Sequence, residues 1–337
     1  MRKISFILLI LILLCACAKT TDQVLEEMGY SLDEIDLIMT LSEENQNRFL
    51  DTYDEKLLGI VTNPSFKEEN LDTYLKYYGE MDDELIFDFV NRDIINDNNH
   101  LQLKEIYESP YYVSGNEDLY FQYLGEYDDI RTMMEIVNTK RYLPLYENVE
   151  VSDTSYDYLL LVNKYYQLPS DYEPDDLVDI EGARHTVQIR SVVKDAFEEL
   201  NKSANEAGYN LVIYSAYRSY AYQEGLYNKY LLTDSMENVD TYSARPGHSE
   251  HQSGLCLDVS LPGVDIDNFY MTEASKWLAE NCYDYGFIIR YEEGKEDITG
   301  YQAEPWQIRY VGKDASKKIQ EMGITFDEYW ECFVRND

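Results

Sequence analysis

The segment Ala244–Asp258, which reads ARPGHSEHQSGLCLD, constrains the fold of this 337-residue chain more than any other stretch. Within 255–259, leucine and valine occupy every second position, which predicts a strand whose apolar side packs on a core. Asp258 then points away from that core. Gly254 permits a sharp bend between His251 and the strand. The segment therefore predicts a sheet with polar side chains on one face, next to a turn.

The surrounding sequence alternates between helical and strand patterns. Helices are predicted over 188–208, 220–232 and 272–285, and strands over 211–214, 287–290 and 306–312. The apolar run 158–162 is predicted to be a further strand. Short links between mixed elements predict a compact α+β domain over 152–337, with a small antiparallel sheet and flanking helices.

Residues 26–150 are acidic, rich in tyrosine and internally repeated. The stretch 70–83 (NLDTYLKYYGEMDD) recurs at 116–129 (NEDLYFQYLGEYDD), an offset of 46 residues. This period and its helical pattern predict an all-α array of helix pairs, which would serve as a spacer or bind a protein partner that the sequence does not identify. In each copy a glycine marks the end of one helix and an aspartate caps the next: Gly79 with Asp82, and Gly125 with Asp128.

The first residues predict where the protein is delivered. A basic start and an apolar run too short to span a bilayer are typical of a signal peptide. Residues 14–17, Leu-Cys-Ala-Cys, match the bacterial lipobox, in which the final cysteine is acylated after cleavage. We therefore expect residues 1–17 to be a lipoprotein signal peptide. Cys17 would hold the mature protein at the outer side of the plasma membrane, with 18–25 as a tether.

The charge excludes one class of partner. The chain has 65 Asp and Glu against 28 Lys and Arg, a formal net charge of −37. Such a surface repels nucleic acid, whose binding depends on basic residues that neutralise phosphates. It also opposes direct adsorption to anionic lipid, and is typical of a well-solvated surface.

After maturation three cysteines remain, in spacings that fit no thiolate zinc site, so free thiols are expected: Cys256, Cys282 and Cys332.

Three motifs together resemble the VanY-type D,D-carboxypeptidases, zinc enzymes that trim D-alanine from peptidoglycan stem peptides. The chain reads SAYRS at 215–219, SEHQSGLCLD at 249–258 and EPWQ at 304–307. The family pattern at these places is S-G-Y-R-S, S-x-H-x-x-G-x-A-x-D and E-P-W-H. The resemblance covers about residues 158–330.

The resemblance implies a role for each matching residue. It makes His251 and Asp258 zinc ligands, and a catalytic zinc uses three protein ligands and one open position. It makes Glu304 the general base toward the attacking water. Arg218 would stabilise the oxyanion or bind the substrate carboxylate. Two further matching positions line the substrate pocket of the family: Gln223 and Ser249.

Position 307 departs from the family pattern, because Gln307 stands where the family has its third zinc-binding histidine. A glutamine amide offers a weaker oxygen ligand and no second nitrogen for a neighbour to orient. A site of His251, Asp258 and Gln307 would hold a metal ion with lower affinity, and its changed ligand set could favour another divalent ion. Cys256 shares a strand face with Asp258, where the family has alanine, and is an alternative ligand.

Two classes of function remain open. In the first, the chain is a zinc D-alanyl-D-alanine carboxypeptidase-like peptidase with an altered metal site. In the second, catalysis is lost and the lipoprotein binds stem peptides as a sensing or scaffolding module. The presence of the other family residues favours the first. Either class acts outside the membrane on a peptidoglycan stem peptide.

Overall fold

The computed structural model describes residues 19–335, in a chain that divides into two compact units, 1–108 and 109–337. The predicted signal peptide and its Cys17 lie outside the described residues. Within 19–335, none of the helices has the length and apolar character that crossing a bilayer requires.

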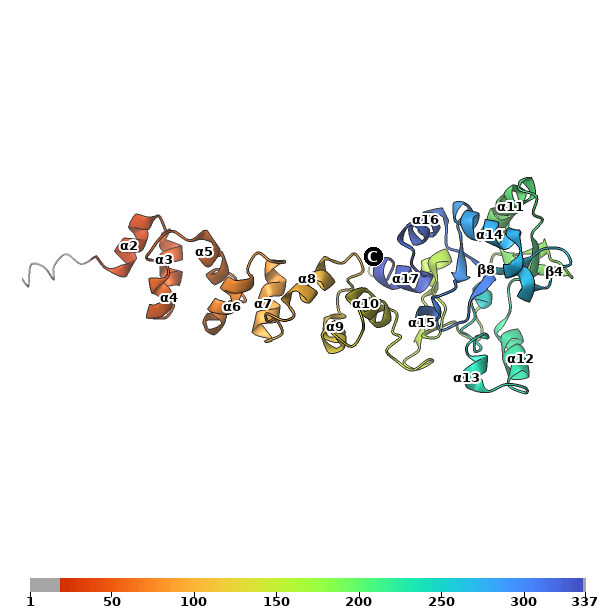
Figure 1. Cartoon of the computed structure of the whole chain (residues 1–337), viewed down its shortest axis with the longest axis horizontal. Coiled ribbons are helices and arrows are strands. Elements are labelled where there is room, and N and C mark those ends of the chain that lie inside the picture. Colours follow the sequence, from red (N-terminus) through yellow and green to blue (C-terminus); the bar gives the residue numbers. More distant parts are fainter. Residues whose placement is uncertain (1–18, 336–337) are drawn as a thin grey trace, which may run out of the picture. The chain divides into compact units, whose positions relative to one another are not determined.

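The first unit consists of short helices whose ends follow from the sequence. Ser31 begins α3 with a capping box, in which its hydroxyl accepts a bond from the Glu34 amide and the Glu34 carboxylate accepts one from the Ser31 amide. Gly29, at φ +100°, ends the preceding helix. The helices of this unit, several of them labelled in Figure 1, are α2 (Thr21–Met28), α3 (Leu32–Ile38), α4 (Glu43–Asn47), α5 (Glu55–Val61), η1 (Glu68–Asn70), α6 (Leu71–Tyr77), α7 (Asp83–Asn91) and α8 (His100–Glu108).

The sequence repeat is also a repeat of structure. In the first copy, α6 and α7, the Tyr74 hydroxyl donates to Asn91 Oδ1 over 2.6 Å and Asn70 Nδ2 donates to the same oxygen over 3.1 Å. In the second copy, α9 (Glu117–Tyr123) and α10 (Ile130–Asn138), the equivalent tyrosine and asparagine donate to Asn138 Oδ1 over 2.5 and 3.0 Å. One asparagine amide therefore joins the two helices of each pair.

The ends of the repeated helices match the prediction except at one aspartate. Gly79 and Gly125 follow α6 and α9 at φ +85° and +88°. Asp82 caps α7 by accepting a bond from the Glu84 amide. In the second copy the cap is Asp129, which accepts from Thr132, so the prediction of Asp128 was wrong. The reason is that α10 begins one residue later relative to its repeat.

The second copy of the repeat belongs to the second unit. There α10 packs against α17 (Phe326–Phe333), and Arg131 forms a 2.7 Å ion pair with Glu328. Asn138 Nδ2 also contacts Cys332 Sγ at 3.5 Å. The division between the units consequently falls after residue 108, whereas the change in composition lies near residue 152.

A four-stranded sheet carries the rest of the second unit. Its order is β5-β6-β8-β7 with every neighbouring pair antiparallel: β5 (Val212–Ser215), β6 (Cys256–Ser260), β8 (Glu304–Tyr310) and β7 (Phe287–Tyr291). Asp258 on β6 pairs with Ser215 on one side and with Gln307 on the other. The small antiparallel sheet and its helices confirm the predicted α+β class, and three polar residues form one row across three strands.

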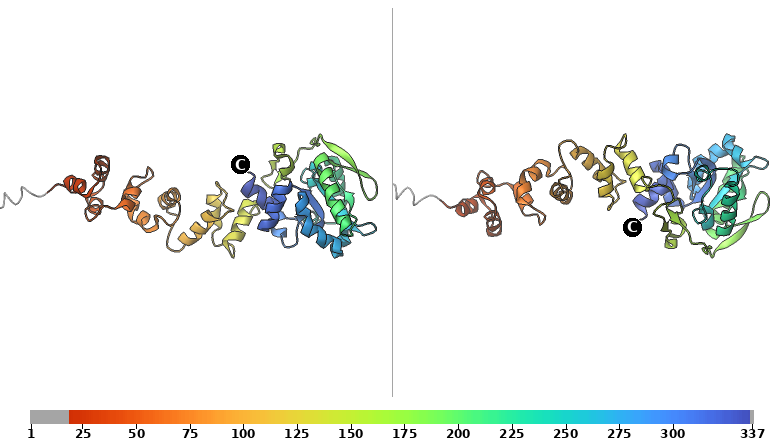
Figure 2. Two further views of the ribbon diagram at one scale, coloured as in Figure 1. Left: turned by 90° about the horizontal axis from the view of Figure 1, so that it is seen from above. Right: turned by 90° about the horizontal axis from the view of Figure 1, so that it is seen from below.

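Helices bury the apolar face of this sheet. In α11 (Ser191–Glu206) the buried stripe is Val193, Ala196, Phe197, Leu200 and Ala204. Figure 2 shows α11, in green, beside the strands. The helix starts later than predicted because 186–190 forms β4. The remaining elements are β1 (Glu150–Val151), η2 (Thr154–Leu159), β2 (Tyr166–Gln167), β3 (Leu177–Glu181), β4 (Thr186–Arg190), α12 (Tyr220–Tyr230), α13 (Met236–Val239), η3 (Glu250–Ser253), η4 (Ile266–Met271), α14 (Glu273–Asn281), η5 (Cys282–Tyr285), α15 (Glu296–Thr299) and α16 (Lys313–Met322).

The predicted strand at 158–162 is absent from the structure. A 3₁₀ helix occupies 154–159, and 160–162 is buried without regular structure. Arg309 donates to the carbonyls of Tyr158 and Leu160, and the Ser152 hydroxyl donates to that of Leu161. Side chains thus donate to these carbonyls the hydrogen bonds that a neighbouring strand would otherwise donate.

Candidate metal and peptide site

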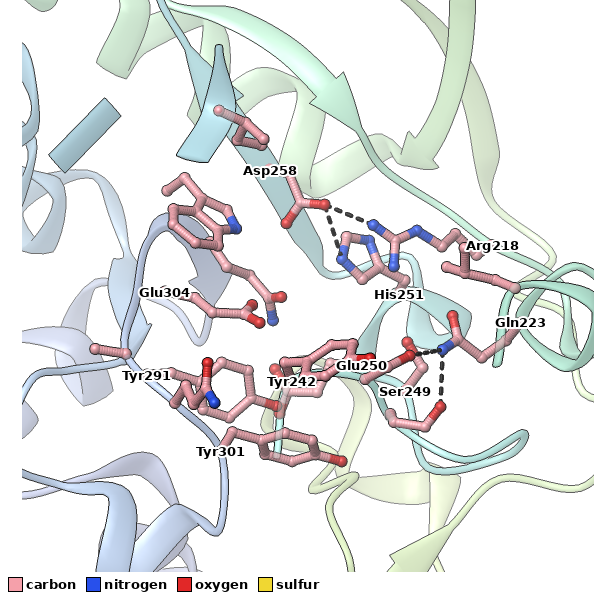
Figure 3. A pocket seen from close by; sticks show the side chains of 18 of the residues that line it. Arg218, Gln223, Tyr242, Ser249, Glu250, His251, Asp258, Tyr291, Tyr301 and Glu304 are labelled. Carbon is pink, nitrogen blue, oxygen red and sulfur yellow. Dashed lines mark hydrogen bonds and ion pairs between the residues drawn. The ribbon is translucent and has the colours of Figure 1, made fainter. Parts of the chain in front are cut away.

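A pocket of about 440 Å³ lies on the polar side of the sheet. Its lining comes from β6, from β8 and the loop before it, from η3, and from the segment 242–244. Figure 3 shows Arg218, His251 and Asp258 meeting on one side of the pocket, with Glu304 facing them. All the predicted site residues lie among the residues that line it: Arg218, Gln223, Ser249, His251, Asp258, Glu304 and Gln307.

His251 is held in one orientation by its backbone and by a hydrogen bond. It lies in η3, which Gly254 ends at φ +68°, the bend that the sequence predicted. Its Nδ1 lies 2.6 Å from the Ala216 carbonyl oxygen, and since a carbonyl only accepts, Nδ1 carries the proton. In the neutral ring, Nε2 is then the nitrogen with the free lone pair. It is buried, has no hydrogen-bond partner and lies 3.3 Å from Asp258 Oδ2.

Asp258 is 5 % exposed and sits at the centre of the sheet. Arg218 donates to its Oδ2 over 2.6 Å, and its Oδ1 is buried without a hydrogen-bond partner. Burial alone would raise the pKa of Asp258, but the positive charges of His251, when its ring is protonated, and of Arg218 outweigh burial and hold the pKa below the usual range. The carboxylate is therefore ionised at neutral pH.

The unsatisfied atoms test whether a metal ion fits here. Two buried acceptors, His251 Nε2 and Asp258 Oδ1, have no partner, and nitrogen with carboxylate oxygen suits Zn²⁺. Gln307 is buried and directly opposite Asp258 on β8, where its side-chain oxygen is a third available ligand. Over residues 19–335, no group of three or more His, Cys, Asp or Glu is arranged to hold a metal ion. The residues fit a divalent ion with two strong ligands and one weak one.

Cys256 does not replace the missing ligand. It is fully buried, pairs with Arg309 across the strands and belongs to no metal-binding group within the described residues. Burial raises the pKa of its thiol well above the usual range, which opposes the thiolate form that binds metals. Cys256 is also not among the residues that line the pocket, so the geometry does not favour the alternative ligand suggested by the sequence.

Glu304 lines the pocket from the start of β8, where the strand is irregular. In a regular strand, Glu304 and Gln307 would point to opposite faces. The pairing shifts between Ile289–Ile308 and Tyr291–Glu304, so β8 carries two extra residues there, and both side chains line the pocket. Burial, and then the charge of Asp258, raises the pKa of Glu304 to about 8. A carboxyl group with such a pKa can both release and accept a proton near neutral pH.

The remaining predicted residues fix the geometry of the pocket. Arg218 also donates to the Ser215 hydroxyl over 2.8 Å, so the row across the strands orients its guanidinium. Gln223, which is 2 % exposed, donates to the Ala244 carbonyl over 2.8 Å and leaves its Oε1 without a partner. Ser249 lies directly before η3 and is buried.

A buried ionic network next to His251 was not predicted from the sequence. Glu250 Oε1 lies 2.8 Å from Arg290 Nε and 2.9 Å from an Arg309 nitrogen. Arg290 also pairs with Asp327 of α17 over 2.7 Å. All four residues are at most 2 % exposed. The sequence indicated this network only through one arginine in each of two predicted strands. The network anchors η3, and therefore His251, to β7, β8 and α17.

Comparison with known proteins places this fold among carboxypeptidases. The family model VanY, D-alanyl-D-alanine carboxypeptidase, matches residues 186–313. The solved structure of LdcB LD-carboxypeptidase, described as revealing the molecular basis of peptidoglycan recognition, is 40% identical with a TM-score of 0.52. The match covers 55% of this chain and 91% of that one. The second unit thus has a carboxypeptidase fold.

Two curated relatives identify the family within this class of carboxypeptidases. The putative carboxypeptidase YodJ of Bacillus subtilis is 41% identical over 194 residues, which are 55% of this chain and 71% of the relative. The bifunctional D-Ala-D-Ala dipeptidase and D-Ala-D-Ala carboxypeptidase VanXYC of Enterococcus gallinarum is 34% identical over 183 residues, which are 52% of this chain and 95% of the relative. This chain belongs to the VanY D-alanyl-D-alanine carboxypeptidase family.

Proposed function

We propose that this protein is a metal-dependent carboxypeptidase that acts on peptidoglycan stem peptides and binds its metal ion weakly because of Gln307. The observation that carries the proposal is the pair of buried acceptors, His251 Nε2 and Asp258 Oδ1, which the fold holds without partners. Unsatisfied buried acceptors cost stability, and a bound cation removes that cost. The family relationship supports the substrate class.

The residues around this pair have distinct roles in the proposed reaction. His251, Asp258 and Gln307 would hold a divalent ion, which supplies Lewis-acid polarisation of the scissile carbonyl. Glu304 takes a proton from the attacking water and passes it to the leaving amine, a task that its raised pKa suits. Arg218 offers its guanidinium to the oxyanion or to the terminal carboxylate of the peptide.

One observation favours a second candidate, a peptide-binding module without catalysis. Arg218 already neutralises Asp258 through a 2.6 Å ion pair, so the carboxylate has a cationic partner in the absence of metal. A binding module of this kind would retain peptide affinity in the presence of a chelator. The carboxypeptidase would lose hydrolysis under the same treatment.

Restoring the family ligand tests the proposal. Gln307→His should raise zinc affinity at least ~10-fold, because changes even beyond the direct ligands commonly alter metal affinity by 10–100-fold. It should also raise hydrolysis of peptides that end in D-alanine. Zinc binding is measured by titration against a competing chelator, and hydrolysis by release of D-alanine. Gln302→His is the matched control, because it adds a histidine to the same pocket outside the Asp258–Gln307 row.

A second substitution separates metal binding from proton transfer. In the Gln307→His background, Glu304→Ala should abolish turnover and retain zinc, since Glu304 is assigned as base and not as ligand. If the unmodified protein binds zinc stoichiometrically and Gln307→His changes neither affinity nor rate, the weak-ligand proposal is wrong. A Gln307→His protein that binds zinc but cleaves no peptide favours the binding module.

The same proposal includes a site of action outside the plasma membrane. Residues 14–17 support it, because they match the pattern that is lipidated at the final cysteine. Cys17→Ser should yield a protein that incorporates no labelled fatty acid in growing bacteria. Incorporation equal to that of the unmodified protein would contradict lipidation at Cys17.

A further inference from the structure

A lysine is buried next to the pocket without lining it. Lys164 is 1 % exposed, and its Nζ donates to the Asp240 carbonyl over 2.5 Å and to the Tyr146 hydroxyl over 3.2 Å. The same nitrogen lies 3.6 Å from the centre of the Tyr301 ring. A buried ammonium group is costly unless its partners compensate for lost water. Here one amine contacts three separate parts of the chain.

Two of these parts lead directly into pocket-lining segments. Tyr301 begins the lining segment 301–304, and Asp240 precedes the lining segment 242–244. The two segments also meet through the Gln302 amide, which donates to the Thr241 carbonyl over 2.8 Å. Gly300 makes room for the lysine, since a Cβ there would lie 2.6 Å from Lys164 Cε. The lysine therefore lies where the two lining segments approach each other.

Within residues 19–335, no carboxylate forms an ion pair with this amine. The Asp240 carboxylate is already occupied by Arg245, over 2.7 Å, and by the Tyr227 hydroxyl, over 2.7 Å. The Lys164 amine thus contacts a backbone carbonyl and two tyrosines. These contacts fix the positions of the segments that carry them and do not neutralise the charge of the amine. The titratable and charged groups that face it from all sides are Asp240, Arg245, Arg141, Glu304, His248, Tyr146 and Tyr301.

We propose that Lys164 is a positioning residue for the peptide pocket, whose buried amine ties the Tyr301 segment to the 242–244 segment. The inference rests on the proposed function only where it concerns the bound peptide. Burial, outweighing Asp240, lowers the pKa of Lys164 to about 7. The tie should therefore be strongest at acid pH, where the amine is charged, and weaken as the pH rises above neutrality.

Three variants of the full chain test the tie. Lys164→Met removes the amine and keeps a similar shape, and Lys164→Arg keeps a charge at every pH. Lys140→Met is the control, because Lys140 also lies over a tyrosine, with its Nζ 4.3 Å from the Tyr166 ring centre, and lines no part of the pocket. Hydrogen exchange is measured for peptides that cover 240–246 and 296–304, at pH 6 and pH 8.5. The KM and kcat for hydrolysis of a stem pentapeptide are measured at the same pH values.

At pH 6, Lys164→Met should speed exchange in both segments about 10-fold and raise KM by a similar factor, with kcat changed less than 2-fold. At pH 8.5 the ratio of variant to unmodified protein should approach 1. Lys164→Arg should retain low KM and slow exchange at both pH values. Unchanged exchange in Lys164→Met, an equal effect of Lys140→Met, or a loss of the same size at both pH values would overturn the inference. If exchange responds as expected but the unmodified protein neither binds nor cleaves the peptide, the tie stands and the proposed function fails.

Discussion

His248 and His251 lie three residues apart in one motif and meet opposite environments. His251 presents a free nitrogen to Asp258 in the pocket. His248 is buried beneath the edge of the Tyr146 ring, and its Nδ1 donates to the Asn163 carbonyl over 2.7 Å. Burial, together with the positive charges of Lys164 and Arg245, lowers the pKa of His248 to about 4. The two histidines therefore differ in function: one is available as a ligand and the other holds the motif in place.

This difference predicts a pH dependence of stability. Because the pKa of His248 is about 4 in the folded state and about 6.5 in the unfolded state, the unfolded state binds more protons between these values. The free energy of unfolding should then rise with pH from 4 to 6.5, by about 3 kcal/mol from this group. His248→Asn retains a donor for Asn163 and should flatten that rise.

The measurement is urea unfolding between pH 4.5 and 7.5, followed by tryptophan fluorescence. All three tryptophans, Trp277, Trp306 and Trp330, belong to the second unit, so the signal reports that unit alone. Other titrating groups are common to both proteins and cancel in the difference. Parallel curves for the variant and the unmodified protein would show that His248 titrates normally.

At the scale of elements, one asparagine joins each repeated helix pair. Asn138 accepts from Tyr120 and Asn116 and donates to the Tyr111 carbonyl over 2.8 Å. Asn138→Ala leaves buried polar groups unpaired and should cost the second unit about 2–4 kcal/mol. Asn91→Ala, the same change in the first copy, should leave the tryptophan transition unaltered and lower only an earlier transition seen by circular dichroism. Equal effects of both on tryptophan fluorescence would contradict the division of the repeats between two units.

Helices and strands with a regular spacing of apolar residues were predictable from the sequence. The irregular positions within them were not. The strands at 255–259 and 287–290 and the helix over 191–206 follow from the spacing of apolar residues. The irregularity at the start of β8, where Glu304 lines the pocket, follows from nothing in the local pattern. The run 158–162 was wrongly predicted to be a strand. Its apolar side chains are buried as in a strand, but its carbonyls accept hydrogen bonds from the distant Arg309. Pairing between remote residues decides such cases, and a local pattern carries no information about it.

At the scale of the molecule, the second unit needs the second repeat copy. Removal of residues before 152 would strip Arg131 from Glu328, a carboxylate whose side chain is 2 % exposed, and would remove the Tyr146 contact of Lys164. The buried Glu328 carboxylate would then lack its cationic partner, which should destabilise the shortened chain. A shortened chain that begins at residue 109 should unfold at the same urea concentration as the full chain. One that begins at residue 152 should bind a hydrophobic dye and show a broad transition. Equal midpoints for the two shortened chains would place the boundary at the change in composition.

The row Ser215–Asp258–Gln307 has a consequence for the history of the protein. The sheet fixes the position of residue 307 opposite Asp258 through backbone pairing, whatever side chain residue 307 carries. Every glutamine codon is a single base change away from a histidine codon. A lineage that carries this chain is therefore one point mutation from the histidine of the family pattern at this position. The weak metal binding proposed above would thus be reversible by a single substitution.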